Sequence, residues 1–215
     1  PRRRVRRRTV AASGLAMGVG VALLRLLGAW EGLELAAYDQ MLKLRPAEKP
    51  DPHLLMVTVD DTSSAWLREQ LKQRVFTPGI GTIPEGALAQ TLEILGKHDP
   101  ALIGLDFYRD FEADPVVAQH LSQMDRLILL CKASYEGKGV LPPPEVPLER
   151  VGFNDFSKDR RQYVRRHLIK QAADEEFCPT EEAFSLQLAR RYLAQQGIDY
   201  QDPWADAADR PLMFG

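Results

Sequence analysis

Hydrophobic residues form one long uncharged stretch near the N-terminus and several short runs further along the chain. Residues 9–24 carry no charged side chain, and the stretch reaches Trp30 with Arg25 as its single charged interruption. A helix over residues 9–30 would be about 33 Å long, enough to cross the hydrocarbon core of a bilayer. The pattern predicts a transmembrane helix over 9–30, with Arg25 extending toward the far interface.

A block of positive charge precedes this stretch. Residues 1–8 contain six arginines, and no acidic residue occurs before Glu31. Because positively charged flanks stay in the cytoplasm, residues 1–8 are expected to be a cytoplasmic N-terminus in the inner membrane, with the rest of the chain outside it, in the periplasm. A cleaved secretory signal and a soluble protein with a basic arm remain as alternatives.

The helical pattern continues beyond Trp30 until Pro46. It predicts a stalk helix over residues 31–46 that prolongs the membrane helix without a break. One helical stripe of the stalk is apolar (Leu33, Ala37, Met41 and Leu44). Together with the small-residue pair Gly14 and Gly18, this stripe favours a homodimer held by helix 9–44, in addition to contact with the lipid bilayer.

The remaining residues, 47–215, are expected to form one extracytoplasmic domain. Short apolar runs alternate with helical patterns, and this order favours a parallel sheet covered by helices. The expected strands are 54–59, 101–107 and 127–131, and the expected helices are 64–72, 84–97 and 114–124.

The second half of this domain has a different pattern. Residues 151–153 and 164–172 are expected to be strands that pair in antiparallel fashion, followed by a helix over 180–196. The predicted fold class is therefore α/β, with a mostly parallel central sheet, flanking helices and a mixed or antiparallel second half.

Charge narrows the possible functions. The chain of 215 residues has a formal net charge of −2, yet residues 31–215 hold nine more acidic than basic residues. Binding to nucleic acid is therefore disfavoured, because phosphate contacts need Lys and Arg distributed over the fold.

Carboxylates follow the first two predicted strands. Asp60 and Asp61, with Ser63 close behind, end the first strand, whereas Asp106 ends the second and Asp110 lies just beyond. At the carboxyl edge of a parallel sheet they would bind a ligand or a divalent cation such as Mg²⁺ or Ca²⁺. The alternative is structural: Asp60 and Asp61 cap a helix and Asp106 binds loop amides.

Two further features have both a functional and a structural interpretation. Arg165 belongs to a basic group with Arg160, Arg161 and Arg166, which either receives an anionic ligand or pairs with nearby acids. Cys131 and Cys178 are the only cysteines. They are either two buried thiols or, outside the cytoplasm, a disulfide.

Several stretches in order resemble the cyclase/histidine-kinase-associated extracellular sensory domain of type 2. They are Val59–Ser63, Ile103–Asp110, Val151–Asp155, Asp159 with Val164–Arg166, and Ala183–Ala189. The resemblance covers residues 31–215. In two places this chain departs from many family members: Glu85 stands where they carry Arg, and the loop after Asp159 lacks their Asp-Gly turn.

The resemblance implies an extracytoplasmic sensory input domain that is not itself an enzyme. It further implies membrane helices and a cytoplasmic output domain after residue 215, and an unknown small-molecule or protein ligand. No cofactor is expected, apart from the divalent cation considered above. A metal-dependent hydrolase and a structural assembly module, each anchored to the membrane, are the alternative functions.

Overall fold

The computed structural model describes residues 2–26, 28, 30–72, 83–135, 137–159, 162–201 and 212–214. The chain divides into two compact units, Pro1–Thr58 and Val59–Gly215. We call them the N-terminal unit and the C-terminal unit and describe each by itself. The predicted domain boundary between residues 46 and 47 stays a prediction.

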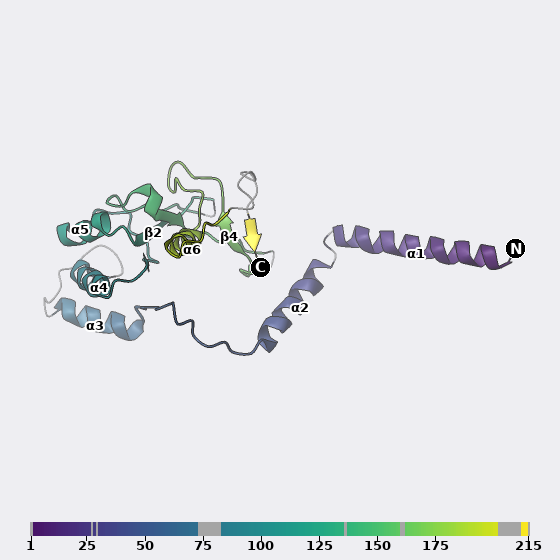
Figure 1. Ribbon diagram of the computed structural model, residues 1–215, viewed down its shortest axis with the longest axis horizontal. Helices are drawn as coiled ribbons and strands as arrows, with labels where there is room; N and C mark the ends of the chain where they lie inside the picture. The colour runs from purple at the N-terminus through teal and green to yellow at the C-terminus, as the bar shows by residue number, and fades with distance from the viewer. Residues whose placement is uncertain are drawn as a thin grey trace. The chain divides into compact units, whose positions relative to one another are not determined.

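Two helices form the N-terminal unit: α1 (Arg2–Leu26) and α2 (Glu31–Leu44) (Figure 1). The prediction of one unbroken helix over residues 9–44 is wrong. The reason is the backbone at Gly28, which has a φ of 71°, in the left-handed region that ends helices. Its amide donates a hydrogen bond to the Arg25 carbonyl oxygen, 3.0 Å away, as in a helix C-terminal turn.

Helix α2 ends close to Pro46, where the sequence predicts the end of the stalk helix. Arg45, the residue after the helix, is extended, with φ −63° and ψ 127°. Pro46 explains this conformation, because a proline disfavours helical geometry in the residue before it. In the part of the chain that the structure describes, no helix has the length and apolar character needed to cross a membrane.

The prediction of a buried central strand over residues 54–59 is also wrong. This segment has no strand pairing, and the exposed fractions of Leu54, Leu55 and Met56 are 79%, 82% and 84%. An apolar, β-branched run has the propensity of a strand, but a strand also needs a neighbour for its backbone hydrogen bonds. The segment is therefore left unpaired, outside any helix or strand.

The C-terminal unit is built on a parallel three-stranded sheet, as the alternating pattern predicted. Its strands are β1 (Ile103–Gly104), β2 (Leu127–Cys131) and β3 (Val151–Phe153), in the order β1-β2-β3. Both neighbouring pairs are parallel, with Ile103 opposite Leu127 and Leu129 opposite Val151.

The expected antiparallel pairing of residues 151–153 with 164–172 is wrong. Strand β3 instead completes the parallel sheet beside β2. The second segment contains β4 (His167–Lys170), which pairs in antiparallel fashion with β5 (Leu212–Phe214). The fully apolar strand β2 is buried along its whole length, and β3 covers one of its two edges.

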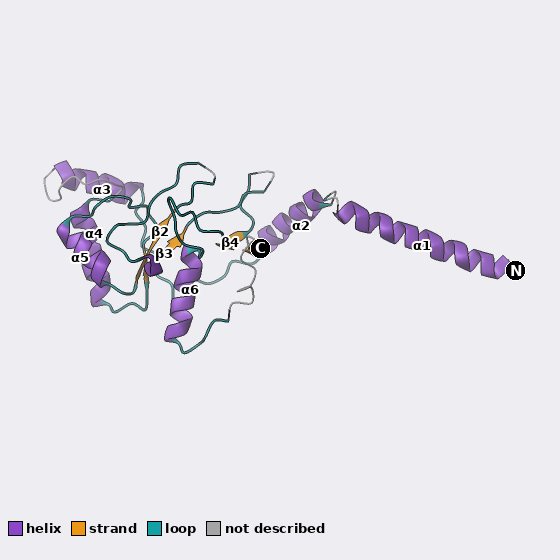
Figure 2. Ribbon diagram, turned by 90° about the horizontal axis from the view of Figure 1, so that it is seen from above, coloured by secondary structure: helices purple, strands orange, loops and turns teal. Residues whose placement is uncertain are grey.

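Helices lie on both faces of the parallel sheet (Figure 2). On one face α4 (Glu85–Lys97) packs against α5 (Pro115–Gln123), whereas α6 (Phe184–Gln195) packs against β2 and β3 from the other. A further helix, α3 (Asp61–Lys72), contacts α4 through Leu67 and Ala87.

The core of the C-terminal unit lies between the sheet and these helices. Each large apolar side chain that is fully buried contributes about 1.5–3 kcal/mol to stability. The fully buried residues of the core include Leu92 of α4, Val117 and Leu121 of α5, and Leu127 to Leu129 of β2.

Candidate functional site

Polar side chains gather where the three parallel strands end. Asp106 follows β1, Ser134 follows β2, and Asn154 and Asp155 follow β3. The Asn154 Nδ2 donates a hydrogen bond to Asp106 Oδ1, 2.8 Å away, and so links two strand ends. In open α/β sheets ligands bind at this edge. We call the following residues the carboxyl-edge cluster: Asp106, Tyr108, Ser134, Asn154, Asp155, Gln171 and Asp174.

Tyr108 places a phenol next to these carboxylates. Burial raises the pKa of Tyr108 above its usual value of 10.0, and the nearby charges of Asp155 and Asp106 raise it further. The side chain is nevertheless 39% exposed. Tyr108 therefore keeps its proton at neutral pH and offers a hydrogen-bond donor to solvent or to a ligand.

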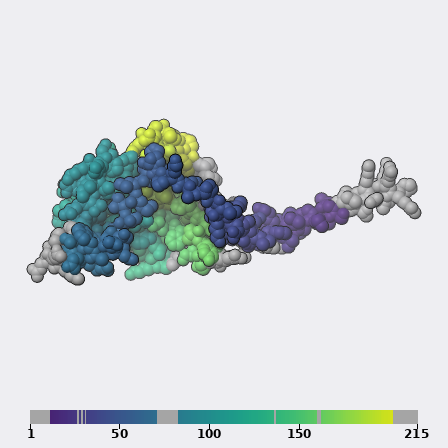
Figure 3. Space-filling model, turned by 90° about the horizontal axis from the view of Figure 1, so that it is seen from below, coloured from purple at the N-terminus to yellow at the C-terminus, as the bar shows by residue number. Residues whose placement is uncertain are grey.

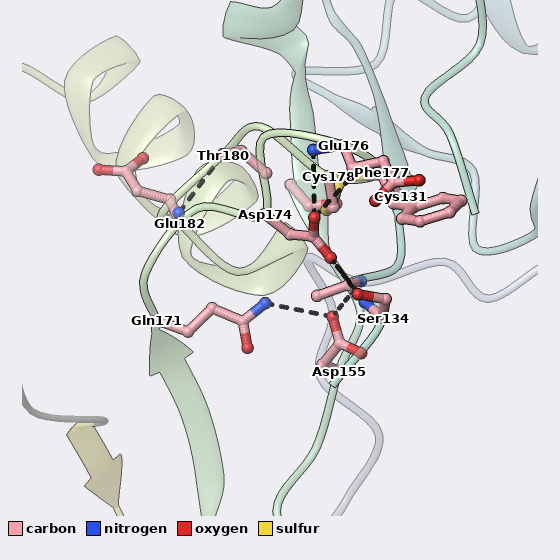
Figure 4. Close-up of a disulfide and its surroundings, with 12 residues drawn as sticks. Cys131, Ser134, Asp155, Gln171, Asp174, Glu176, Phe177, Cys178, Thr180 and Glu182 are labelled. Atoms are coloured by element: carbon pink, nitrogen blue, oxygen red, sulfur yellow. Dashed lines mark hydrogen bonds between the residues drawn. A yellow bond between two sulfur atoms is a disulfide. The ribbon is translucent and has the colours of Figure 1, made fainter. Parts of the chain in front are cut away.

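Asp155 connects three segments of the chain (Figure 4). Its Oδ2 accepts hydrogen bonds from the Ala133 amide, 2.9 Å away, and from Gln171 Nε2, 3.2 Å away. One carboxylate thus joins the end of β3, the end of β2 and the segment after β4. These hydrogen bonds hold the Asp155 carboxylate in place at the sheet edge.

Asp174 organises the neighbouring loop (Figure 4). Its Oδ2 accepts from the Ser134 amide at 2.8 Å and from the Ser134 hydroxyl at 2.7 Å, while its Oδ1 accepts from the amides of Glu176 and Phe177. The bonds from Ser134 are the main cause of a pKa below the usual value of 3.8 for Asp174. The carboxylate is therefore charged at neutral pH and holds the loop to the end of β2.

The disulfide fastens the same loop covalently. Cys131, the last residue of β2, is bonded to Cys178, and the two Cα atoms are 5.4 Å apart. Both cysteines are fully buried. The disulfide considered from the sequence is thus confirmed, and it fixes residues 174–178 beside the carboxyl-edge cluster (Figure 4).

Asp60 and its neighbours form the N-terminal cap of α3. The Asp60 Oδ1 accepts a hydrogen bond from the Ser63 amide, 2.7 Å away, and Asp61 is the first residue of α3. Hydrogen bonds from Ser63 lower the pKa of Asp60 below 3.8. This geometry is the structural alternative weighed for these residues, an N-terminal helix cap.

The two other predicted site residues, Asp110 and Arg165, are not members of the carboxyl-edge cluster. Asp110 is exposed in the loop after β1. Arg165 forms an ion pair with Asp159, and its guanidinium lies over the Tyr163 ring, 4.8 Å from the centroid. The side chains of Arg165 and Asp159 are only 10% and 16% exposed. The structural pairing considered for Arg165 is therefore present.

Some cluster residues were missed by the sequence reasoning. Asn154 and Asp155 follow an apolar strand, as Asp106 does, so the same rule would have found them. Asp174 and Gln171 follow no strand of the parallel sheet, and the sequence pattern carries no signal for them.

Within the described residues, no three His, Cys, Asp or Glu side chains are grouped so that they could hold a metal ion. The carboxylates of Asp155 and Asp174 are already occupied by amide donors. The divalent cation considered from the sequence stays a prediction.

A hollow of about 290 Å³ lies at the opposite, amino edge of the sheet, between the end of α4 and the start of β2. The residues lining it include Gly96, Asp99, Met124 and Arg126. Two of its lining residues, Arg126 and Asp99, form an exposed ion pair. The carboxyl-edge cluster, with its half-buried and exposed polar groups, offers the richer recognition chemistry.

Comparison with known proteins identifies the family. The family model of the CHASE2 domain matches residues 16–213. No curated protein and no solved structure matches the chain. The matched region contains all three strands of the parallel sheet and the whole carboxyl-edge cluster. The chain belongs to the CHASE2 domain family, a family of extracellular sensory domains found in signalling proteins.

Proposed function

We propose that this chain is the extracytoplasmic input domain of a membrane-bound bacterial receptor, and that it binds its ligand at the carboxyl-edge cluster. The observation that carries the binding site is the group of Asp106, Tyr108 and Asn154 at the ends of β1 and β3. These side chains reach solvent in part, at the edge where open α/β sheets bind ligands.

The cluster favours a small polar ligand with positive charge. Burial is the main cause of the raised pKa of Tyr108, and the charges of Asp155 and Asp106 raise this pKa further, so their negative potential extends to its ring. A partly exposed aromatic ring next to carboxylates attracts an organic cation through its π face and through charge. The Tyr108 hydroxyl supplies a hydrogen-bond donor that completes the recognition.

A thermal-shift screen tests this proposal. The chain is heated with small amines, amino acids, neutral metabolites and divalent cations, each added separately. We expect one of the cationic compounds to raise the melting temperature by several degrees, because binding only to the folded state stabilises it. Asp106→Asn and Asn154→Ala should abolish the rise, while Gln119→Ala, at an exposed position of α5, should keep it. A rise that survives both cluster variants, or no response to any compound, contradicts the proposal.

The proposed location rests on the disulfide. Disulfides persist in oxidising compartments such as the periplasm and are rare in the cytosol. In this proposal the arginine block and residues 9–30 attach the chain to the inner membrane, and an output domain after residue 215 receives the signal.

Thiol alkylation in intact bacteria tests the location: Cys131 and Cys178 should resist the reagent until a reductant and a denaturant are added together. Immediate labelling in the denatured, unreduced protein contradicts it.

We also propose that two copies associate through α2. Leu33, Met41 and Leu44 share one stripe of this helix, and their exposed fractions are 65%, 64% and 82%. Single cysteines placed along residues 32–44 should crosslink between copies with a helical period. A crosslinking yield that does not vary along the helix contradicts this association.

A further inference from the structure

The loop between β3 and β4 presents aromatic, aliphatic and basic side chains at the surface. Phe156, Tyr163 and Val164 are 49%, 61% and 53% exposed, and Lys158 and Arg166 are exposed as well. We call residues 155–166 the aromatic-basic loop. In Figure 3 the green segment that contains this loop lies at the surface of the C-terminal unit.

A hydrogen-bonded turn shapes the loop. The Asp159 amide donates to the Tyr163 carbonyl at 2.9 Å, and the Tyr163 amide donates back to Asp159 Oδ1 at 3.0 Å. The Gln162 amide donates to the Asp159 carbonyl at 2.9 Å. The ion pair from Arg165 to Asp159 joins the two sides. These bonds hold Asp159, Gln162 and Tyr163 in place, and residues that are fixed before binding lose less conformational entropy when they bind.

Cations lie over both exposed rings. The Lys158 Nζ is 5.6 Å from the centroid of the Phe156 ring, and the Arg165 guanidinium is 4.8 Å from that of Tyr163. Each aromatic side chain therefore carries its own positive charge beside an apolar surface. Exposed rings next to a Lys whose charged end extends toward water, as Lys158 does beside Phe156, are typical of membrane–water interfaces, whereas Arg165 is paired with Asp159 and is only 10% exposed.

The charge of the loop is opposite to that of the domain. It has five basic residues (Lys158, Arg160, Arg161, Arg165 and Arg166) and two acidic ones, whereas residues 31–215 as a whole hold nine more acidic than basic residues. Both acids of the loop, Asp155 and Asp159, already accept hydrogen bonds. The loop is therefore a positively charged site on an acidic domain.

We propose that the aromatic-basic loop docks on the surface of an anionic phospholipid bilayer. The exposed Lys158 and Arg166 complement the lipid phosphates, and Phe156, Tyr163 and Val164 insert at the level of the headgroups. The acidic remainder of the domain is repelled by the same surface, so this contact orients the domain. The exposed rings and Val164 favour lipid over an acidic protein partner, which charge alone would attract.

Fluorescence quenching at a labelled residue tests the docking in the full chain. Ser157→Cys carries an environment-sensitive dye in the loop, and Ser122→Cys, at an exposed position of α5, carries the same dye as the control. The vesicles contain phosphatidylcholine with brominated acyl chains, either alone or with one quarter phosphatidylglycerol. Because the dye reports only on its own surroundings, attachment of the N-terminal segment to the vesicle does not produce the signal.

Docking predicts quenching at residue 157 with the anionic vesicles, little with neutral ones, and little at residue 122 with either. Each basic residue near an anionic surface strengthens partitioning by about fivefold, so Lys158→Ala with Arg166→Ala should weaken the docking by about 25-fold. Phe156→Ser with Tyr163→Ser should reduce quenching without changing the melting temperature of the chain.

Three results would overturn the proposal. The first is no quenching at residue 157, and the second is equal quenching with neutral and anionic vesicles. The third is a dye signal that needs a second copy or another protein instead of lipid, which would assign the loop to a protein partner.

Discussion

The guanidinium of Arg109 and the carboxylate of Glu85 form a buried ion pair that ties the loop after β1 to the first turn of α4. The Arg109 Nη2 lies 2.8 Å from Oε1 and 2.9 Å from Oε2 of Glu85, and the two side chains are 2% and 8% exposed. Glu85 also accepts a hydrogen bond from the Asp114 amide, 3.2 Å away. The loop that carries Asp106 and Tyr108 is therefore fixed at its far end.

Removing one partner of this pair should destabilise the domain strongly. Glu85→Met leaves the Arg109 charge buried without its carboxylate, and Arg109 Nε already has no hydrogen-bond partner among the described residues. We expect a loss of about 3–5 kcal/mol in the free energy of unfolding, measured by urea denaturation. Glu85→Met combined with Arg109→Met should lose less than either single variant. Purely additive losses would mean that the pair is not coupled.

Gly152 permits the close approach of α6 to β3. A Cβ at this position would lie 2.4 Å from the Phe184 amide nitrogen and 2.8 Å from the Ala183 carbonyl carbon, both of which are backbone atoms. Gly152→Ala should therefore lower the melting temperature by many degrees or prevent folding.

Gly96→Ala is the matched control for Gly152→Ala. Its Cβ would meet only Met124 Cε at an ordinary 3.6 Å, so the variant should be neutral or gain about 0.5–1 kcal/mol from the better helix propensity of alanine. Equal effects of the two variants would refute the close packing of α6 on β3.

The disulfide should be a structural bond that reductant alone does not reach. Cys131 and Cys178 are fully buried, and they are 47 residues apart in the sequence. Replacing both by Ala should cost about 4 kcal/mol, the loop-closure entropy of the unfolded chain. Without denaturant, a thiol reductant should leave the melting temperature unchanged for hours. A prompt fall would show that the bond is accessible and open to redox control.

Asp174 should make the stability of the domain depend on pH under acidic conditions. Its folded-state pKa is lowered, so its stabilising effect is complete above its usual pKa of 3.8 and is lost as the pH falls through the folded-state pKa. Chemical denaturation of the wild type and of Asp174→Asn should therefore show a stability difference that narrows below about pH 4. Glu175→Gln removes the same charge from the neighbouring residue as a control. A difference that stays constant with pH contradicts this role of Asp174.

The parallel sheet and its helices follow from local patterns in the sequence. The fully apolar run 127–131 becomes β2 because it can be buried on both faces, and Asp114, which accepts a hydrogen bond from the Val116 amide, begins α5 with Pro115. Such signals lie within a few neighbouring residues. The sequence therefore predicts these elements well.

The wrong predictions concern the pairing of strands and the backbone angle of a single residue. The pattern of residues 54–59 indicates a strand but contains no information about a neighbouring strand, and that of 151–153 does not distinguish β2 from β4 as its neighbour. The left-handed conformation of Gly28 interrupts a helix in which glycine is otherwise common. Each of these outcomes depends on a contact or an angle that periodicity does not encode.

The same limit applies to the site. Asp106 was expected at the sheet edge because it follows its own strand. Asp174 was not expected, because its role is to bind Ser134, which lies 40 residues earlier in the sequence. Bonds between distant segments complete the carboxyl-edge cluster, and a single sequence does not reveal them.

The most direct test of the proposed binding site compares two aspartates that both lie near predicted strand ends. Isothermal titration of the compound that stabilises the chain is carried out on Asp106→Asn and on Asp60→Asn. Asn is as good a helix cap as Asp, so Asp60→Asn should fold and bind as the wild type does. We expect Asp106→Asn to fold but to lose binding. Retained binding by Asp106→Asn, or lost binding by Asp60→Asn, would contradict the proposed binding site.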